Sequence, residues 1–284
     1  MANIKTLFPA ALCATVLMAS CGNGGEKTET VTDTTTVTTT APAKANLQLA
    51  AVSQSPEFAN AGLGIGNVTA APQGADSVKV TFNFNVKNYE LKKQTDDAAG
   101  KLCNNSDKGQ HIHFILDNKP YVALYEPKHE MVLPKNGEHN LMVFLSRSYH
   151  ESVKSKGAAQ VYSFELTDGK LEKTPVPATP MVFYSRPKGD YLGKDTENLL
   201  FDYYVWNGGL SSTGNKVKAH VTGDGLDTTF TIDEWKAQFL KAMPMGKSSI
   251  TLTLLDKDGN KVNGPETEVT REFNLSKEEP MTAK

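Results

Sequence analysis

From residue 46 onward, apolar and polar side chains alternate along the chain with a period of two. The clearest run, residues 78–87, has valine or phenylalanine at every even position and a polar residue at every odd position. Because successive side chains of a strand point to opposite faces, this pattern predicts an antiparallel strand with one face in a core. Similar strand-like runs are expected at residues 114–116, 140–145, 159–166, 199–206, 217–221 and 249–255.

Short turn-forming sequences separate these runs, as an antiparallel architecture requires. They are Asp117-Asn118, Asn136-Gly137, Asp168-Gly169 and Asp258-Gly259. One segment differs, because the spacing of Trp235, Phe239 and Leu240 within residues 231–242 predicts a helix with one apolar side. Apart from that helix, the sequence predicts an all-β fold.

The chain also repeats itself. The run Phe82–Leu91 recurs 119 positions later as Phe201–Leu210, with aromatic, aliphatic, asparagine and leucine residues at matching places. Further on, the segments that begin at His113 and His220 match at a separation of 107 positions, which indicates an insertion of 12 residues in the first copy. The repeat predicts two tandem immunoglobulin-like β-sandwich domains, with an eight-stranded barrel as the alternative for each copy.

The start of the chain has the layout of a bacterial lipoprotein signal. One cation, Lys5, precedes an apolar run that ends in Leu17-Met18-Ala19-Ser20-Cys21. This order predicts cleavage before Cys21 and attachment of acyl chains such as palmitate to its sulfur, so that the protein is anchored in the cell envelope of a bacterium. The outer membrane is the favoured location, because Gly22 rather than aspartate follows Cys21. The alternative is an ordinary secretory signal, with Cys21 incidental.

A threonine-rich segment follows the signal. Residues 28–40 are nearly all threonine, and Pro42 comes soon after. A segment with so little apolar mass is expected to be a disordered tether, with an O-glycosylated stalk as the alternative. The predicted order along the chain is signal peptide, tether, first domain and second domain, at residues 1–20, 21–45, 46–175 and 176–284.

Composition narrows the choice of function. The formal net charge is −2, so no basic excess indicates a nucleic-acid partner. Of the three cysteines, Cys13 leaves with the signal and Cys21 takes lipid, so Cys103 has no disulfide partner. The 39% hydrophobic content is sufficient for packed cores, but after the signal no apolar run approaches the length of a membrane-spanning helix.

Two histidines on one strand suggest a metal site. His111 and His113 are two positions apart, so their imidazoles project from the same face of the predicted strand, and His150 is available as a third ligand. Such a cluster could bind zinc or copper. The alternative is that these histidines only form hydrogen bonds on a polar sheet face. The second copy keeps His220 but has Lys218 in place of His111.

The loop after residues 140–145 is the expected ligand surface. Arg147 could clamp a phosphate or carboxylate group of a peptide or another anionic ligand. The neighbouring residues expected to bind the same ligand are Ser146, Ser148, Tyr149, His150 and Glu151. Serine, histidine and glutamate are also the residue types of a hydrolase triad, but here they are crowded together without a glycine elbow. We therefore expect no enzymatic activity.

Three strings carry a resemblance to a known family. They are Gly109–Tyr121, Ser146–Ser152 and Ser185–Tyr191. They resemble a family of Bacteroidota envelope lipoproteins that is often labelled phosphopeptide-binding protein. The resemblance implies a non-catalytic extracytoplasmic protein. The sequence thus predicts a lipid-anchored binding or structural module, with a metal-binding lipoprotein as the alternative.

Overall fold

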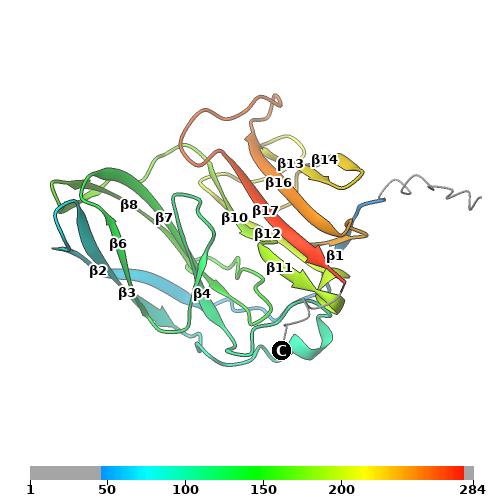
Figure 1. The fold of residues 1–284 in the computed structure, drawn as a ribbon, viewed down its shortest axis with the longest axis horizontal. Coiled ribbons are helices and arrows are strands. Elements are labelled where there is room, and N and C mark those ends of the chain that lie inside the picture. Colours follow the sequence, from blue (N-terminus) through cyan, green and yellow to red (C-terminus); the bar gives the residue numbers. More distant parts are fainter. Residues whose placement is uncertain (1–45, 278–284) are drawn as a thin grey trace, which may run out of the picture. The chain divides into compact units, whose positions relative to one another are not determined.

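The computed structural model describes residues 46–277, which fold as an all-β structure (Figure 1). Two short 3₁₀ turns, Ala98–Gly100 and Gly193–Thr196, are the helical elements of this part of the chain. Among the described residues, no helix is long and apolar enough to cross a membrane. The strands form four hydrogen-bonded sheets, and every pairing except that between β11 and β17 is antiparallel.

The first copy of the repeat supplies two sheets. The smaller has the order β2 (Gly62–Pro72), β3 (Ser77–Lys87) and β6 (Lys128–Pro134). The larger has the order β5 (Val122–Leu124), β4 (His111–Leu116), β7 (Gly137–Ser146), β8 (Ala159–Thr167) and β9 (Lys170–Thr174).

The second copy repeats most of this arrangement, with an added strand in its smaller sheet and a parallel fifth strand in its larger one. Its smaller sheet has the order β1 (Gln48–Ala51), β15 (Gln238–Lys241), β12 (Leu199–Trp206) and β10 (Met181–Arg186). Its larger sheet has the order β11 (Gly189–Leu192), β17 (Glu268–Ser276), β16 (Gly246–Leu255), β13 (Lys216–Gly223) and β14 (Leu226–Ile232).

The strand orders confirm the sequence repeat and the prediction of tandem immunoglobulin-like sandwiches. The order β5-β4-β7-β8 of the first copy corresponds to β14-β13-β16-β17 of the second. The register agrees as well, because His113 lies opposite Phe144 and His220 lies opposite Thr251. Even the left-handed backbone after β3 recurs after β12, with φ values of 52° at Asn88 and 54° at Asn207.

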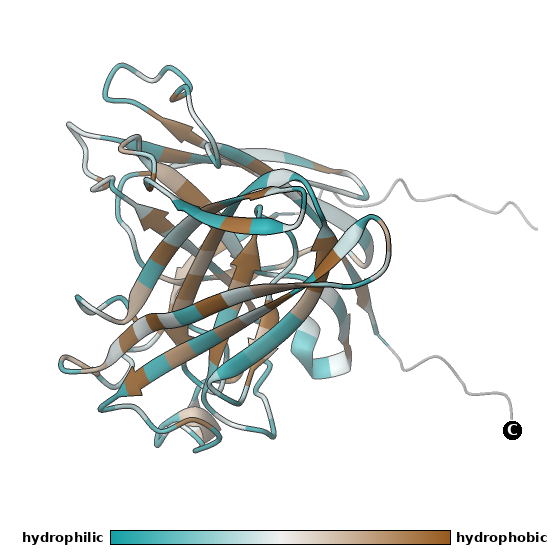
Figure 2. Ribbon diagram, turned by 90° about the vertical axis from the view of Figure 1, so that its left-hand side faces the viewer, coloured by the Kyte–Doolittle hydropathy of each residue, from teal (hydrophilic) through white to brown (hydrophobic). Residues whose placement is uncertain are grey.

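Alternating side chains fill the core of each copy, and bands of opposite hydropathy follow one another along the strands in Figure 2. On β3, Val80 and Phe82 are fully buried, as their even positions predict. In the first copy they pack with Phe114 and Phe164, and edge-to-face contacts join Phe82 to both rings. The second copy has its own core on the inner faces of β12, β13 and β16.

A third apolar cluster covers the outer face of β4 and β7. Met142 and Phe144 of the first copy pack there against Phe183 and Tyr204 of the second copy. The Phe144 and Tyr204 rings are stacked with centroids 5.2 Å apart. As a result β4 is buried on both faces along its whole length, including the face that carries the two histidines.

Two expectations are corrected. The helix predicted at residues 231–242 is wrong, because this segment contains the end of β14, a connection and the strand β15. Phe239 and Leu240 pack into different apolar clusters, as adjacent residues of a strand do, and Trp235 lies in the connection with its indole donating to the Tyr203 carbonyl. The sequence prediction assigns residues 48–51 to the first domain. They pair instead with β15 of the second copy, and the preceding Leu47 packs into the core of that copy.

Candidate metal centre

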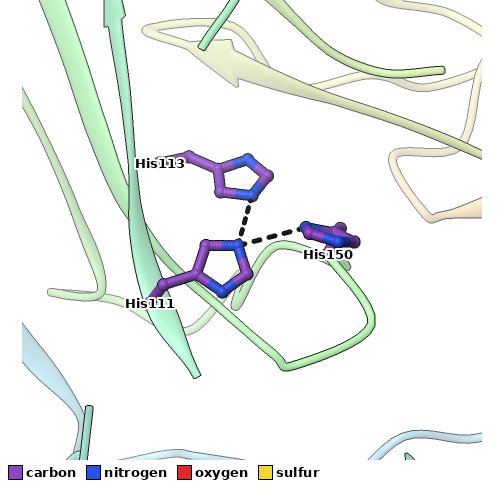
Figure 3. Close-up of side chains that lie close together, drawn as sticks. All are labelled: His111, His113 and His150. Atoms are coloured by element: carbon purple, nitrogen blue, oxygen red, sulfur yellow. Dashed lines mark hydrogen bonds between the residues drawn. The ribbon is translucent and has the colours of Figure 1, made fainter. Parts of the chain in front are cut away.

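Three imidazole rings converge on one point inside the protein (Figure 3). His111 and His113 project from the same face of β4, and His150 reaches them from the loop after β7. The Nε2 atom of His111 lies 2.9 Å from Nε2 of His113 and 3.1 Å from Nδ1 of His150. The three atoms that could bind a metal lie within 4.8 Å of one another. The structure therefore brings together the three histidines that the sequence suggested.

Aromatic groups and the second copy enclose the cluster. His111 and His113 have no exposed surface, and His150 is 6% exposed. The His113 ring stacks on Tyr121 with centroids 3.7 Å apart and planes 9° apart. Its Nδ1 atom lies 3.0 Å from the Ser185 hydroxyl on β10, a contact across 72 positions of sequence. The site thus includes residues of both copies.

Burial keeps all three rings neutral near pH 7. It lowers the pKa of His111 to about 4, although a hydrogen bond to the Gly109 carbonyl opposes this shift. Burial also holds the pKa values of His113 and His150 well below the ordinary value. The positive charges of Arg186 and Lys188 lower the pKa values further. Neutral imidazole is the form that binds a metal.

The hydrogen bonds within the cluster compete for one acceptor. The Nδ1 atom of His111 lies 2.8 Å from the Gly109 carbonyl, which only accepts, so Nδ1 carries the proton and Nε2 has a single lone pair. That lone pair faces both His113 and His150. If both neighbours donate, they share one lone pair. If Nδ1 of His150 instead accepts from the Tyr121 hydroxyl, which is 3.2 Å away, the lone pairs of His150 Nδ1 and His111 Nε2 face each other.

The backbone of His150 also adopts a conformation that glycine adopts most easily. Its φ is 69°, in the left-handed region where glycine is preferred. The equivalent turn of the second copy, after β16, has Gly259 at this place with φ 84°. The two turns share their hydrogen bonds: the amide of His150 donates to the Arg147 carbonyl at 2.9 Å, and that of Gly259 to the Asp256 carbonyl at 3.1 Å. The first copy thus has an imidazole where its own repeat has glycine, at a cost of about 1 kcal/mol.

The loop expected to display a ligand surface is buried, which corrects that expectation. Arg147 is 6% exposed, and its guanidinium donates to the carbonyls of Pro56 and Ser152 at 2.6 and 3.0 Å. It also lies 3.5 Å from the carboxylate of Glu151. The segment around Pro56 that covers Arg147 lies 91 positions earlier in the chain, so no sequence pattern near Arg147 predicts this burial. Arg147 therefore braces the loop from within.

The other loop residues are engaged in the same way. The Ser146 hydroxyl donates to the Arg147 carbonyl at 3.2 Å, and the Ser148 hydroxyl accepts from the Thr95 amide at 3.2 Å. Tyr149 is 1% exposed, and Glu151 accepts from the Ser55 hydroxyl at 2.5 Å. Because Ser148 bonds to Thr95 while His150 faces His111, these residues do not form a hydrolase triad.

The sequence reasoning missed the cations beside the cluster. Arg186 is 7% exposed, and its guanidinium donates to the Tyr191 hydroxyl at 2.9 Å. Lys188 donates to the Tyr121 carbonyl at 3.0 Å, and burial lowers the pKa of Lys188 to about 8. Both belong to the string Ser185–Tyr191, one of the three that carry the family resemblance. That resemblance did not predict that the string lies beside His113.

Cys103 is the free cysteine of the described part of the chain, and its surroundings make it unreactive. It packs at the edge of a small apolar cluster with Leu200 and Phe239. Burial, with Glu151 as a smaller contribution, raises the pKa of the Cys103 thiol to about 12. A thiol that stays protonated is a poor nucleophile and a poor metal ligand.

Comparisons with known proteins give structural neighbours only. No family model matches the chain, and no curated protein matches it. The fibronectin(III)-like modules of Clostridium thermocellum CbhA are 14% identical, with a TM-score of 0.25, over 74% of this chain and 94% of that one. The two tandem V-type regions of VCBP3, a v-region-containing chitin binding protein, are 8% identical with a TM-score of 0.23, over 70% and 92%. A bacterial adhesin from Mobiluncus mulieris is 10% identical with a TM-score of 0.20, over 76% and 98%.

Proposed function

We propose that this protein is a lipid-anchored module of the bacterial cell envelope that binds a transition metal, zinc or copper, without catalysing a reaction. The observation that carries the proposal is the convergence of His111 Nε2, His113 Nε2 and His150 Nδ1 within 4.8 Å. Three neutral imidazoles whose nitrogen atoms lie this close together are a ligand set for either metal.

A bound metal would resolve the conflict between the lone pairs. Metal–nitrogen bonds of about 2.0–2.1 Å place nitrogen ligands about 3.3–3.6 Å apart. The observed separations of 2.9 and 3.1 Å around His111 need to widen by a few tenths of an ångström, and the third pair, His113 with His150, lies within 4.8 Å. The second ring nitrogens of His111 and His113 already have partners in the Gly109 carbonyl and the Ser185 hydroxyl, which would orient the rings as outer-shell partners commonly do.

The metal content of the purified protein tests the proposal. We expect one equivalent of zinc or copper, and loss of that metal in the double variant His111→Ala, His113→Ala. His220→Ala is the matched control, because His220 occupies the position of His113 in the second copy but is exposed and bonds to Asp227. Metal-free protein whose melting temperature does not change in added zinc and copper would refute metal binding.

The envelope location is tested separately. Cys21 lies outside the described residues, and its sequence context supports lipidation. Cells expressing the protein and fed a labelled fatty acid should incorporate the label into the protein, and Cys21→Ser should abolish this incorporation. A Cys21→Ser protein that is labelled as strongly as the original would remove the anchor from the proposal and leave the metal site unaffected.

A further inference from the structure

Two cations lie beside the three histidines. Arg186 and Lys188 both lie against the ring of Tyr121, on which His113 stacks. Neither cation takes part in any of the ion pairs formed among residues 46–277. The Nε atom of Arg186 is buried without a hydrogen-bond partner in the same range. A metal ion at the cluster would therefore enter a region of positive potential.

Tyr121 contacts both the cations and the imidazoles. Its ring stacks on His113, and the Lys188 ammonium lies 4.1 Å from the same ring centroid. The Arg186 guanidinium carbon lies 5.5 Å from that centroid. Cations are not metal ligands, so Arg186 and Lys188 act on an ion at the cluster through their field.

Resting on the proposed metal site, we infer that the histidine cluster selects cuprous copper, Cu(I), over divalent ions. A divalent ion meets twice the repulsion that a monovalent ion meets from Arg186 and Lys188. One extra unit of charge about 10 Å from a cation, at an effective dielectric constant of about 20, corresponds to roughly a tenfold difference in affinity for each cation. The two cations together disfavour a divalent ion by roughly a hundredfold.

The ligand set does not oppose this selection. Among the described residues, the convergent group of histidine, cysteine, aspartate and glutamate side chains has three members, all imidazoles. Three imidazoles suit copper and zinc alike, and Zn²⁺ held by three protein ligands completes its shell with water. The charge of the ion, rather than the number of ligands, therefore decides the selection.

A competition titration tests the selection. The purified protein is titrated at pH 7 with Cu(I), in the absence of oxygen and with ascorbate present, against a chromogenic Cu(I) chelator. A parallel titration uses Zn(II) against a zinc indicator. We expect one equivalent of Cu(I) to bind at least a hundredfold more tightly than Zn(II). Zn(II) binding of equal or higher affinity would overturn the inference and leave the proposed metal site standing, whereas binding of neither ion would refute the site itself.

Removing one cation sharpens the test. Lys188→Met keeps an aliphatic side chain over Tyr121 but removes the charge, and should strengthen Zn(II) binding about tenfold more than Cu(I) binding. Lys257→Met is the matched control, because Lys257 is exposed in a turn of the second copy and should leave both affinities unchanged. If Lys188→Met also leaves the ratio of the two affinities unchanged, the positive field does not select the ion.

Discussion

Replacing His150 with glycine should abolish metal binding without harming the backbone of the turn. The residue has a φ of 69°, and Gly259 occupies the equivalent turn with a φ of 84°. Glycine adopts this conformation freely, whereas a residue with a Cβ atom pays about 1 kcal/mol or more. His150→Gly and His150→Ala both lose the imidazole, so the difference between them isolates the backbone. We expect the glycine variant to be the more stable of the two by about 1 kcal/mol, the reverse of the order usual in regular structure.

Thermal unfolding with and without metal measures both effects. At a free metal concentration of 100 times the dissociation constant, a single site stabilises the folded state by about 2.7 kcal/mol. For an ordered chain of this size, that corresponds to an upward shift of the melting temperature of roughly 5–10 °C. The original protein should show this shift, and both variants at position 150 should lack it. In the absence of metal, the alanine variant should melt roughly 2–4 °C below the glycine variant.

The second copy supplies the control for the backbone argument. A Cβ atom added at Gly259 would meet no other atom within 4 Å, so Gly259→Ala changes only the conformational preference. It should cost about 1 kcal/mol, matching the difference between the two variants at position 150. A metal-induced shift that survives in His150→Gly would show that His150 is not a ligand. An alanine variant as stable as the glycine variant would refute the assigned strain.

Three further predictions concern acid stability and the braces of the buried loop. The pKa of His111 falls from about 6.5 in the unfolded chain to about 4 in the folded one, so unfolding takes up a proton between these pH values. The free energy of unfolding of the metal-free protein, measured with urea in the presence of a chelator, should therefore fall by roughly 3 kcal/mol between pH 6.5 and pH 4. Equal stability at pH 7 and pH 4.5 would contradict this. Arg147→Met should lower the free energy of unfolding by about 2–4 kcal/mol, because it leaves buried carbonyl groups without donors. Lys257→Met, at an exposed position, is the control and should change the free energy of unfolding by less than about 0.5 kcal/mol. An equally small loss in Arg147→Met would mean that its hydrogen bonds do not stabilise the loop. Asp202→Asn should cost a similar amount, since the carboxylate is 1% exposed and accepts from Lys154 at 2.6 Å; an unchanged denaturation midpoint would contradict this.

The sequence predicts the strands well because their side chains alternate within a few residues. In residues 78–87, the alternation of apolar and polar side chains correctly predicts which side chains of β3 are buried, and β12 begins and ends where the sequence predicts. The segment at residues 231–242 misled the prediction, because Phe239 and Leu240 both had to be buried, on opposite faces of a short strand rather than on one face of a helix. Adjacent apolar residues are compatible with either element, and pairing with β12 and β1 decided the outcome.

The histidine cluster was predictable from the sequence, but its surroundings were not. The spacing of His111 and His113 follows from the strand period, which is a local property. The burial of Arg147 depends on contact with Pro56, and the environment of His113 depends on Ser185, which is 72 positions away. The same serine- and charge-rich loop sequence would suit a solvated loop, and only contacts with distant segments of both copies distinguish the two.

The two copies together explain why one of them holds the histidine cluster. Their strand orders agree, yet the outer face of β4 is covered by the second copy, whereas His220 on β13 remains partly exposed and bonds to Asp227. Burial is what makes the rings on β4 neutral, and it also removes the water that would otherwise satisfy their nitrogens. A duplicated sandwich thus differs in chemistry through packing between the copies rather than through a change of fold. The glycine of the second copy's turn has the backbone conformation that this turn requires, and the first copy has His150 there, beside His111.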